Sequence, residues 1–243
     1  MLVLVVGESC LDVFNYGACG RLCPEAPVPV FNSISRVENL GMCYNVYNNL
    51  VSLGVNCNIL TNKNYRKISK TRFIDEASNH MFMRLDENDS CYGRCRVKKI
   101  NFSLYDAIVI SDYNKGYLTT KDIQYIGDHH DLVFLDTKKI LGPWANNMTY
   151  IKINLSEYLL TKKEIDESLE DKLVITRGPE GAEHKGVIYP VPKVSIRDVS
   201  GAGDTFLAGM VSKYLDSKSI EQSIQFGNEC ATSVVQTRGV SCV

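Results

Sequence analysis

The sequence of 243 residues lacks any apolar run long enough to cross a membrane, since a spanning helix needs about 20 such residues. Its first apolar stretch, Met1–Val6, ends at Gly7 and contains no basic region, so it does not have the form of a secretory signal peptide. The sequence also has no repeat and no low-complexity tract. These absences predict a folded cytoplasmic protein with no membrane partner.

The sequence has no excess of charge of one sign either. Its formal net charge is −1 at pH 7, so composition gives no reason to expect binding to nucleic acid. Nine cysteines are present, but an odd number in a chain of this size does not indicate a disulfide framework. We expect most of these cysteines to be reduced and to serve as packing residues. A zinc site at Cys19, Cys23, Cys91 and Cys95 is the minor alternative, because their spacing could suit zinc.

Short apolar runs alternate with helical patterns, which is typical of an α/β fold with a mostly parallel sheet. The expected strands are Leu2–Val6, Val55–Leu60, Ala107–Ile110, Leu132–Leu135, Tyr150–Ile153 and Leu173–Ile175. The expected helices are Met42–Leu53, Thr119–Ile126, one from Ser156, Gly203–Leu215 and Ile220–Gln236. Thr71–Asp75 and Met81–Leu85 would form a separate strand pair. The segment Pro24–Val30 contains three prolines and is expected to be extended, with an edge strand as one option.

Polar residues follow the carboxyl ends of these strands. They are Glu8 and Asp12, Ser111 and Asp112, Asp136 and Lys138, Asn154 and Glu157, and Thr176 and Gly178. Parallel α/β sheets bind ligands beyond the carboxyl ends of their strands. The pattern therefore predicts a ligand site along one edge of the sheet.

The strongest chemical signal is a run of small residues before an apolar helix face. Gly201, Ala202 and Gly203 would let the backbone approach a ligand, and the free N–H groups of a helix start hold an anion such as a phosphate in transfer. Asp204 could accept the proton of an attacking hydroxyl. On these residues alone, a plain glycine turn with an acidic residue in the first helical turn is an equal alternative, because the run is neither a Walker motif nor a GxGxxG.

The surrounding residues favour the chemical interpretation. Asp198–Phe206 closely resembles the C-terminal signature of the ribokinase-like sugar kinases, the PfkB family. Further motifs follow in the order of that family: Asn154–Glu157 resembles its N-x-x-E element, and Thr176–Gly181 resembles its T-x-G-x-x-G stretch. Gly227–Ala231 is similar to the helix start near the adenine, and Thr237–Val240 matches the end of such domains.

One branch of the family fits best. Arg21–Val30 closely resembles a run in the heptose 7-phosphate kinases, which form the kinase half of bifunctional HldE proteins. Gly7–Asp12, Met83–Asp86, Ser111–Gly116 and Asp136–Lys138 resemble further motifs of that branch. No part of the sequence resembles the nucleotidyltransferase half, so a kinase alone is expected.

The resemblance implies a fold and a reaction. The fold is a three-layer α/β/α sandwich with a small β-sheet lid, formed by about residues 15–37 and 70–92 of a single domain over residues 1–243. The reaction moves the γ-phosphate of ATP, with Mg²⁺, to a hydroxyl of a sugar or sugar phosphate, with heptose 7-phosphate as the first choice. The lid would close over the sugar to exclude water, and pairing of two lids would make a homodimer.

The resemblance also implies roles for individual residues. Asp204 is the catalytic base, and Gly201, Ala202 and Gly203 bind the transferring phosphoryl group. The sugar side comprises Asp12, Gly41, Asn45, Arg84 and Lys115, of which the two cations would meet a phosphate on the sugar. The nucleotide side comprises Asn154, Glu157, Thr176, Gly178, Gly181 and Asn228, of which Asn154 and Glu157 would support Mg²⁺ indirectly. Tyr113 and Tyr117 could stack on a sugar or pack in the core.

Two departures from the family pattern keep alternatives open. Met42 replaces the second glycine of the G-G-x-x-N helix start, where its side chain could crowd the sugar. The chain is also shorter than family domains of about 300 residues, with losses expected after Leu60 and between Gly116 and Asp131. A kinase for another sugar or a nucleoside, and a silent binder of nucleotide or sugar, are the alternatives.

Overall fold

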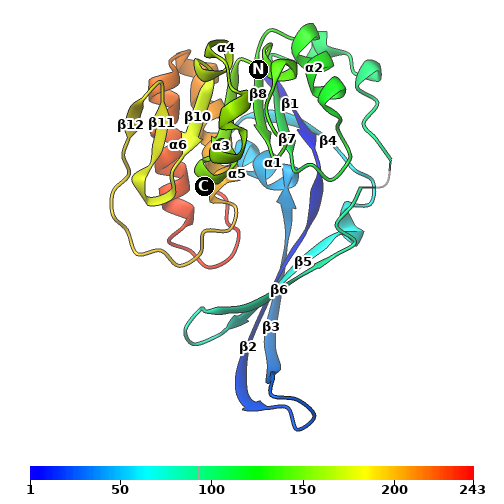
Figure 1. The fold of residues 1–243 in the computed structure, drawn as a ribbon, viewed down its shortest axis with the longest axis vertical. Helices are drawn as coiled ribbons and strands as arrows, with labels where there is room; N and C mark the ends of the chain where they lie inside the picture. Colours follow the sequence, from blue (N-terminus) through cyan, green and yellow to red (C-terminus); the bar gives the residue numbers. More distant parts are fainter. Residues whose placement is uncertain (92) are drawn as a thin grey trace.

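The computed structural model describes residues 1–91 and 93–243, which form two β-sheets and the helices that flank the larger one (Figure 1). The large sheet has eight strands. In spatial order they are β12 (Val187–Tyr189), β11 (Ala182–His184), β10 (Leu173–Thr176), β9 (Tyr150–Asn154), β8 (Val133–Thr137), β7 (Ala107–Asp112), β1 (Leu2–Gly7) and β4 (Asn56–Thr61). In this spatial order, the six strands from β10 to β4 run parallel, whereas β11 and β12 pair antiparallel with their neighbours. The predicted α/β class with a mostly parallel sheet is confirmed.

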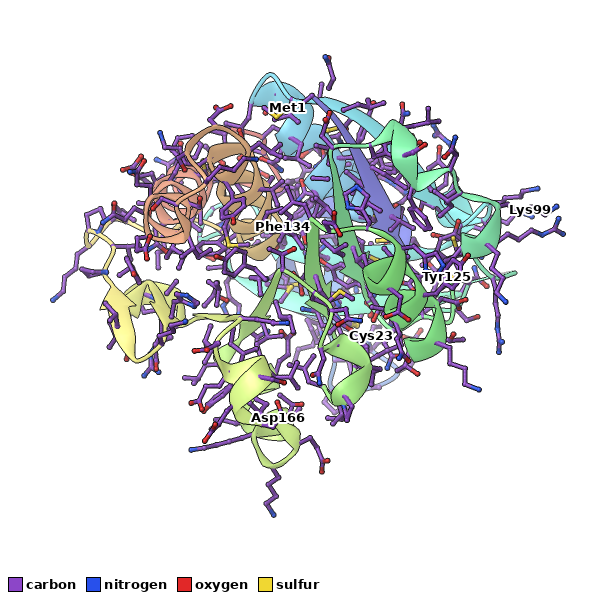
Figure 2. All side chains as sticks on the ribbon, turned by 90° about the horizontal axis from the view of Figure 1, so that it is seen from above. Met1, Cys23, Lys99, Tyr125, Phe134 and Asp166 are labelled. Carbon is purple, nitrogen blue, oxygen red and sulfur yellow. The ribbon has the colours of Figure 1, made fainter. Side chains whose placement is uncertain are left out.

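Helices cover both faces of the large sheet. The first face carries α1 (Cys43–Ser52), α5 (Ala202–Ser217) and α6 (Ile220–Val234), and the second carries α2 (Thr120–His129), α3 (Leu155–Thr161) and α4 (Glu167–Glu170). Figure 2 shows this arrangement from above. Helices α5 and α6 lie on one side of the strand that carries Phe134, and the green helix that bears Tyr125 lies on the other. Short 3₁₀ turns occur at Tyr65–Lys67, Val97–Lys99, Phe102–Leu104, Pro143–Ala145, Lys162–Glu164 and Gly178–Glu180.

The apolar runs of the sequence explain this layering. Successive side chains of a strand point to opposite faces of its sheet. In β1, Val3 and Val5 therefore pack with α1 and α5, whereas Leu4 and Val6 pack with α2 on the other side. A strand that is apolar at every position is stable only with both faces covered, and this is the arrangement observed.

The small sheet consists of β3 (Pro29–Met42), β2 (Ser9–Leu22), β5 (Ser69–Asp75) and β6 (Met81–Glu87) in that order. The β2–β3 hairpin extends far from the large sheet (Figure 1). Glu8 alone separates β1 from β2, and β3 leads directly into α1. The base of the small sheet is therefore fixed at the same edge of the large sheet as the predicted ligand site.

Several predicted boundaries need correction. Only the last two residues of Pro24–Val30 belong to an edge strand, β3. Residues 23–28 form the loop of the β2–β3 hairpin, closed by a 2.8 Å hydrogen bond from the Cys23 N–H to the Val28 carbonyl. Proline is tolerated at the first residue of an edge strand, and β3 begins at Pro29. The strands around the predicted lid segment 15–37 extend from Ser9 to Met42. The end of the second lid segment, residue 92, lies outside the described residues.

Three further expectations concern helices. The helix expected from Met42 begins one residue later, because Met42 is the last residue of β3. The stretch between β4 and β5 contains only the 3₁₀ turn Tyr65–Lys67, in line with the loss expected after Leu60. Helix α2 extends to His129, beyond its predicted end.

Within the described part of the chain, no helix combines the length and the apolar character needed to cross a bilayer. The same residues contain no group of three or more His, Cys, Asp or Glu side chains placed to hold a metal ion. Cys95 is buried in the core with α2, whereas Cys19 lies near the far end of β2. The four cysteines of the zinc alternative are therefore not gathered in one site.

Candidate active site

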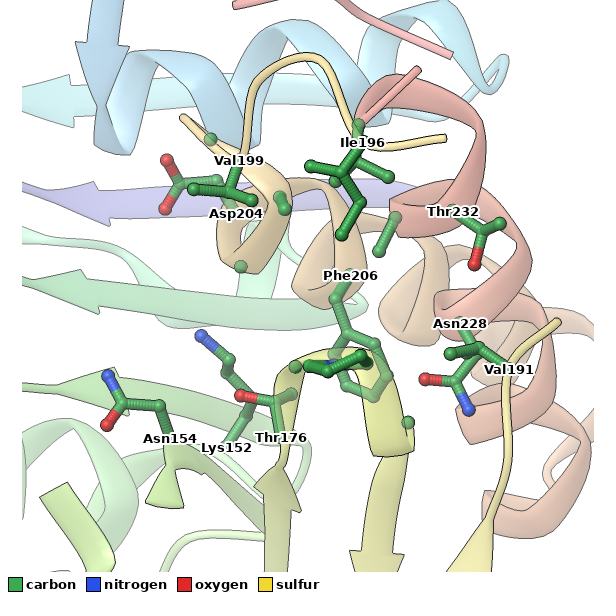
Figure 3. Close-up of a pocket in the computed structure, with 18 of the residues that line it drawn as sticks. Lys152, Asn154, Thr176, Val191, Ile196, Val199, Asp204, Phe206, Asn228 and Thr232 are labelled. Carbon is green, nitrogen blue, oxygen red and sulfur yellow. The ribbon is translucent and has the colours of Figure 1, made fainter. Parts of the chain in front are cut away.

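A cavity of about 790 Å³ opens at the carboxyl ends of β8, β9 and β10, beside the first turn of α5. Asn154 and Thr176 line it from the strand ends, Lys152 from the middle of β9, and Asp204 from α5 (Figure 3). Most of the remaining wall is apolar and includes Val191, Val194, Ile196, Val199, Phe206 and Val235. The cavity therefore joins a polar end, at the helix start, to an apolar end suited to a flat ring.

The residues predicted for the nucleotide lie at this cavity, with one exception. Asn154, Thr176, Gly178, Gly181 and Asn228 all belong to its lining. The Glu157 carboxylate is instead part of a capping box at the start of α3. It accepts a hydrogen bond from the Asn154 N–H at 2.8 Å, and the Asn154 Oδ1 accepts one from the Glu157 N–H at 2.9 Å.

Lys138 links Glu157 to the cavity. Its Nζ lies 2.5 Å from Glu157 Oε1 and 3.5 Å from Asp136 Oδ1. The oxygens of Asn154 and Glu157 are thus already bonded within the protein. This donor set fits Mg²⁺ that is held through phosphates and water rather than inside a closed ring of side chains.

Two glycines shape the start of α5. Gly201 has φ 80°, a left-handed conformation that favours glycine, and a Cβ there would lie 2.6 Å from the Asn45 Nδ2. A Cβ at Gly203 would lie 2.9 Å from the Lys152 Nζ. Larger residues would therefore push these two side chains away. The predicted loop Gly201, Ala202 and Gly203 lines the polar end of the cavity with its backbone, as an anion site at a helix start requires.

Asp204 is buried, with 6% of its surface exposed. Its Oδ1 accepts a 2.6 Å hydrogen bond from the Tyr113 hydroxyl, and its Oδ2 accepts a 3.1 Å hydrogen bond from the Asn45 amide. Burial raises the pKa of Asp204 to about 6, and these two hydrogen bonds limit the rise. The carboxyl is therefore mostly ionised at neutral pH and able to accept a proton.

Tyr113, expected from the sequence to stack or to pack, has a role that was not predicted. The available signal was the position of Tyr113 directly after Asp112, at the carboxyl end of β7. Glu8 fixes this loop: its carboxylate accepts hydrogen bonds from the backbone N–H groups of Tyr113, Lys115 and Tyr117 at 2.8, 3.0 and 3.1 Å. Burial, followed by the nearby charge of Asp112, raises the pKa of Glu8.

The predicted sugar side divides into two groups. Gly41 lies directly beside Asp12, and Asn45 reaches Asp204 from α1. The Asp12 carboxylate is held by Arg72, whose Nη1 lies 2.5 Å from Asp12 Oδ1. Arg72 was not predicted, although its neighbourhood Lys70-Thr71-Arg72 was a cationic pattern within an expected strand.

The two predicted cations lie at opposite ends of an ion-pair network on the small sheet. Arg84 pairs with Asp86 at 2.8 Å, and Lys70 pairs with Asp86 and with Asp89 at 3.1 Å each. Lys115 pairs with Asp89. Arg84 and Lys115 are thus connected through three intermediate side chains and do not meet directly. Of the described residues that line the cavity, none belongs to the five predicted for the sugar.

Met42 has an unusual backbone conformation, with φ 62° and ψ −130°. Its side chain is buried in a small apolar cluster with Cys10 and Ile68 and packs against Tyr113. A non-glycine residue in this region costs roughly 1–3 kcal/mol. The side chain that replaces the second glycine of the motif therefore supports the tyrosine that contacts Asp204.

Sequence comparisons agree with this geometry. The model of the pfkB family of carbohydrate kinases matches residues 47–242. Bifunctional protein HldE of Helicobacter pylori strain Shi470 is 31% identical over 295 aligned positions, which cover 98% of this chain and 63% of that protein. Bifunctional protein HldE of Haemophilus influenzae is 28% identical and is covered over 61% of its length. The chain thus spans less than two thirds of these relatives. The 295 aligned positions exceed its 243 residues, so the Helicobacter protein contains segments that this chain lacks.

Solved structures share the fold at low sequence identity. A Methanocaldococcus jannaschii nucleoside kinase, an archaeal member of the ribokinase family, superimposes with a TM-score of 0.72 at 19% identity, over 98% of this chain and 93% of that chain. Phosphofructokinase-2 from Escherichia coli, in complex with substrates and products, gives a TM-score of 0.73 at 16% identity, over 100% and 95%. These likenesses confirm the ribokinase-like fold.

Proposed function

The chain belongs to the pfkB family of carbohydrate kinases, and from this premise we propose that it transfers the γ-phosphate of ATP to a hydroxyl of heptose 7-phosphate, forming the 1,7-bisphosphate. The observation that carries the proposal is the position of Asp204, a buried carboxyl with a raised pKa in the first turn of α5, next to the glycine loop. Since ATP is the donor, we also propose a cytoplasmic location.

In this proposal, ATP occupies the cavity described above. Its adenine contacts the apolar wall near Asn228, and its phosphates point to the backbone of Gly201, Ala202 and Gly203. Thr176, Gly178 and Gly181 border the nucleotide between these two ends. Mg²⁺, supported through Asn154 and Glu157, would neutralise phosphate charge when it is bound with ATP.

Asp204 and its neighbours act on the acceptor. Asp12, Gly41 and Asn45 orient the sugar, and the Asp204 carboxylate takes the proton of the attacking hydroxyl. Tyr113 and Asn45 hold that carboxylate in position. The small sheet acts as a lid that excludes water from the reacting groups.

The choice of heptose 7-phosphate rests on the motifs of the small sheet and on the similarity to the two HldE proteins. The cationic ends of the ion-pair network, Arg84 and Lys115, would bind the phosphate that the sugar already carries. Met42 favours a second candidate, a kinase for another sugar or a nucleoside, because its side chain occupies the position of a family glycine.

A panel assay separates these candidates. ATP consumption is measured with heptose 7-phosphate, fructose 6-phosphate, fructose, ribose and adenosine, and we expect the highest kcat/KM with heptose 7-phosphate. Higher turnover with another acceptor would establish the second candidate. If ATP binds but no acceptor supports turnover, the protein is a silent binder and the proposed function is wrong.

We also propose a homodimer through the small sheet. Strand β6 is an edge strand whose side chains Met81, Phe82, Met83 and Leu85 are exposed. Exposed apolar edge strands pair readily with other strands. Light scattering should give twice the mass of one chain, and Met83→Asp should reduce it to the mass of a monomer. A monomeric wild-type protein would contradict this arrangement.

A further inference from the structure

We propose that Lys152 is a catalytic residue that donates hydrogen bonds from its Nζ to the transferring phosphoryl group. Lys152 lies in the middle of β9 between Ile151 and Ile153, two fully buried core residues. Its side chain lines the cavity and points to the start of α5 (Figure 3). The inference rests on the proposed kinase reaction but not on the identity of the sugar.

The surroundings of Lys152 leave its Nζ with unused donors. Only 3% of its surface is exposed, and the Nζ lies 2.7 Å from Asp136 Oδ2. Across residues 1–91 and 93–243, no second hydrogen bond of this Nζ is present. An ammonium group has three donors, so two of them remain for a ligand in the cavity. Both Lys152 and Asp136 belong to the cavity lining, so a ligand in the cavity can reach this group.

The position of the Nζ would be unfavourable without a bound anion. It lies so close to Gly203 that a Cβ there would be 2.9 Å away. The N-terminus of a helix carries a partial positive charge, and a second positive charge beside it is repelled. Burial of a lysine also has a large desolvation cost. Asp136 offsets part of this cost, but Asp136 is shared with Lys138. An anion between the Nζ and the α5 backbone would offset both the repulsion from the helix N-terminus and the desolvation cost.

The phosphoryl group in transfer is such an anion. In the reaction, the acceptor oxygen forms a bond to the γ-phosphorus, and the bond from that phosphorus to the β–γ bridging oxygen breaks. The electron pair of that bond stays on ADP, and the proton of the acceptor hydroxyl moves to Asp204. Lys152 keeps its own protons and stabilises the equatorial oxygens, which carry charge throughout the transfer.

Lys152 also acts on Asp204 through its charge, which lowers the pKa of that carboxyl. Removal of the ammonium therefore has two separate consequences. It takes away a donor to the phosphoryl group, and it moves the ionisation of the base to higher pH. A lysine with a purely structural role would produce only the second, so the loss of the donor is the diagnostic consequence.

The test uses a probe that needs no acceptor sugar. Binding of Mg²⁺–ADP, alone and with aluminium fluoride as a mimic of the transferring group, is measured by calorimetry for the wild type, Lys152→Met and Lys152→Arg. For the wild type we expect fluoride to tighten binding. For Lys152→Met we expect ADP affinity within about threefold of wild type but a fluoride effect reduced by ~10²–10³-fold, as for the loss of one transition-state donor. Lys152→Arg should retain part of the effect.

Two further variants control for folding. Lys139→Met removes a half-buried lysine, which pairs with Asp112 at 2.6 Å outside the cavity lining, and should leave the fluoride effect intact. The double variant Lys152→Met/Asp136→Asn removes both charges of the Lys152 pair and should fold while still lacking the effect. A full fluoride effect in Lys152→Met or in the double variant would overturn the inference. Failure of the whole acceptor panel with a normal fluoride effect would instead overturn only the proposed function.

Discussion

The two halves of the candidate site are built on different kinds of support. The nucleotide half rests on β8, whose five residues are all buried, and on its parallel neighbours in the core. The acceptor half rests on the small sheet, where all seven residues of β6 are exposed. Close packing fixes positions in a core, whereas exposed ion pairs contribute little to stability and can exchange partners. Phosphate-binding groups are thus held by packing. On the acceptor half, Asp12 and Asn45 at the base are buried too, but Arg84 and Lys115 are held by ion pairs that a ligand can replace.

The state of the cations follows the same division. On the acceptor half, Arg72, Arg84, Lys70 and Lys115 all have acidic partners within the small sheet or its adjoining loop. A substrate phosphate must compete with those carboxylates. On the nucleotide half, the Lys152 Nζ has one partner and faces the cavity. The difference predicts a preformed nucleotide site and an acceptor site that rearranges on binding.

The largest effect is expected where the two halves meet. Asp204→Asn should lower kcat by ~10²–10⁴-fold, because positioned base catalysis contributes that much. Burial raises the pKa of Asp204 from 3.8 to about 6, so its ionisation destabilises the folded state increasingly between these pH values and fully above about pH 6. The neutral amide should therefore keep or raise the melting temperature at neutral pH. Steady-state kinetics and thermal unfolding measure the two quantities. Activity within about threefold of wild type would refute the assignment of the base.

The next effect isolates the acceptor half. Arg72→Gln should raise the KM for the acceptor about 10- to 100-fold, because hydrogen bonds to charged groups are worth roughly 1.5–3 kcal/mol and Asp12 loses its partner. The Kd for Mg²⁺–ADP should stay unchanged. Arg36→Gln, which breaks an exposed pair with Glu38 on the same sheet, is the matched control. A parallel loss of ADP affinity in Arg72→Gln would show that the halves are not separable.

A smaller effect concerns pH. The rate should rise with pH through about 6, where Asp204 ionises, since the base must be ionised to accept a proton. The hydrogen bond from Tyr113 lowers the pKa of Asp204, so Tyr113→Phe should move the profile to higher pH and lower the rate at pH 6 several-fold. Tyr117→Phe is the control, because only the backbone of Tyr117 bonds to Glu8. A Tyr113→Phe profile that coincides with wild type would contradict the observed role of the hydroxyl.

The smallest effect is expected at Met42. Met42→Gly should widen the range of accepted sugars without changing ADP affinity, because it removes the side chain that packs against Tyr113. Its net effect on stability should be small: strain of roughly 1–3 kcal/mol is relieved while buried apolar contacts are lost. The acceptor panel and thermal unfolding provide the measurements, and Met42→Leu, which keeps an apolar side chain, should retain the original selectivity. An unchanged panel for Met42→Gly would remove Met42 from the specificity determinants.

The comparison also explains what the sequence could predict. The strands and glycine turns of the nucleotide half have local sequence motifs. These motifs were enough to assign a common nucleotide site to residues that all line one cavity: Asn154, Thr176, Gly178, Gly181 and Asn228. Each pattern depends on a few neighbouring residues. The carboxyl ends of the parallel strands β9 and β10 then bring Asn154, Thr176 and Gly178 together by a general rule of the fold, whereas Asn228 reaches the same cavity from α6.

Contacts between distant segments could not be predicted in this way. Tyr113 and Asp204 are 91 positions apart, and Arg72 and Asp12 are 60 positions apart. Such pairs depend on which residues of two strands or loops face each other, and no local pattern encodes that. The prolines of Pro24–Val30 restrict the backbone, but this restriction is compatible with a hairpin loop as well as with an edge strand, so it could not distinguish the two.

The connection through Glu8 has a mechanical consequence. Glu8 is the single residue between β1 and β2, and its carboxylate also holds the loop of Tyr113. Strand β2 has 14 residues and so extends about 45 Å from its base. A change of about 5° in its direction at Glu8 would displace the tip by about 4 Å but Asp12, four residues from Glu8, by only about 1 Å. A small change of angle at Glu8 would therefore alter the position of the hairpin tip far more than that of the carboxylates at its base.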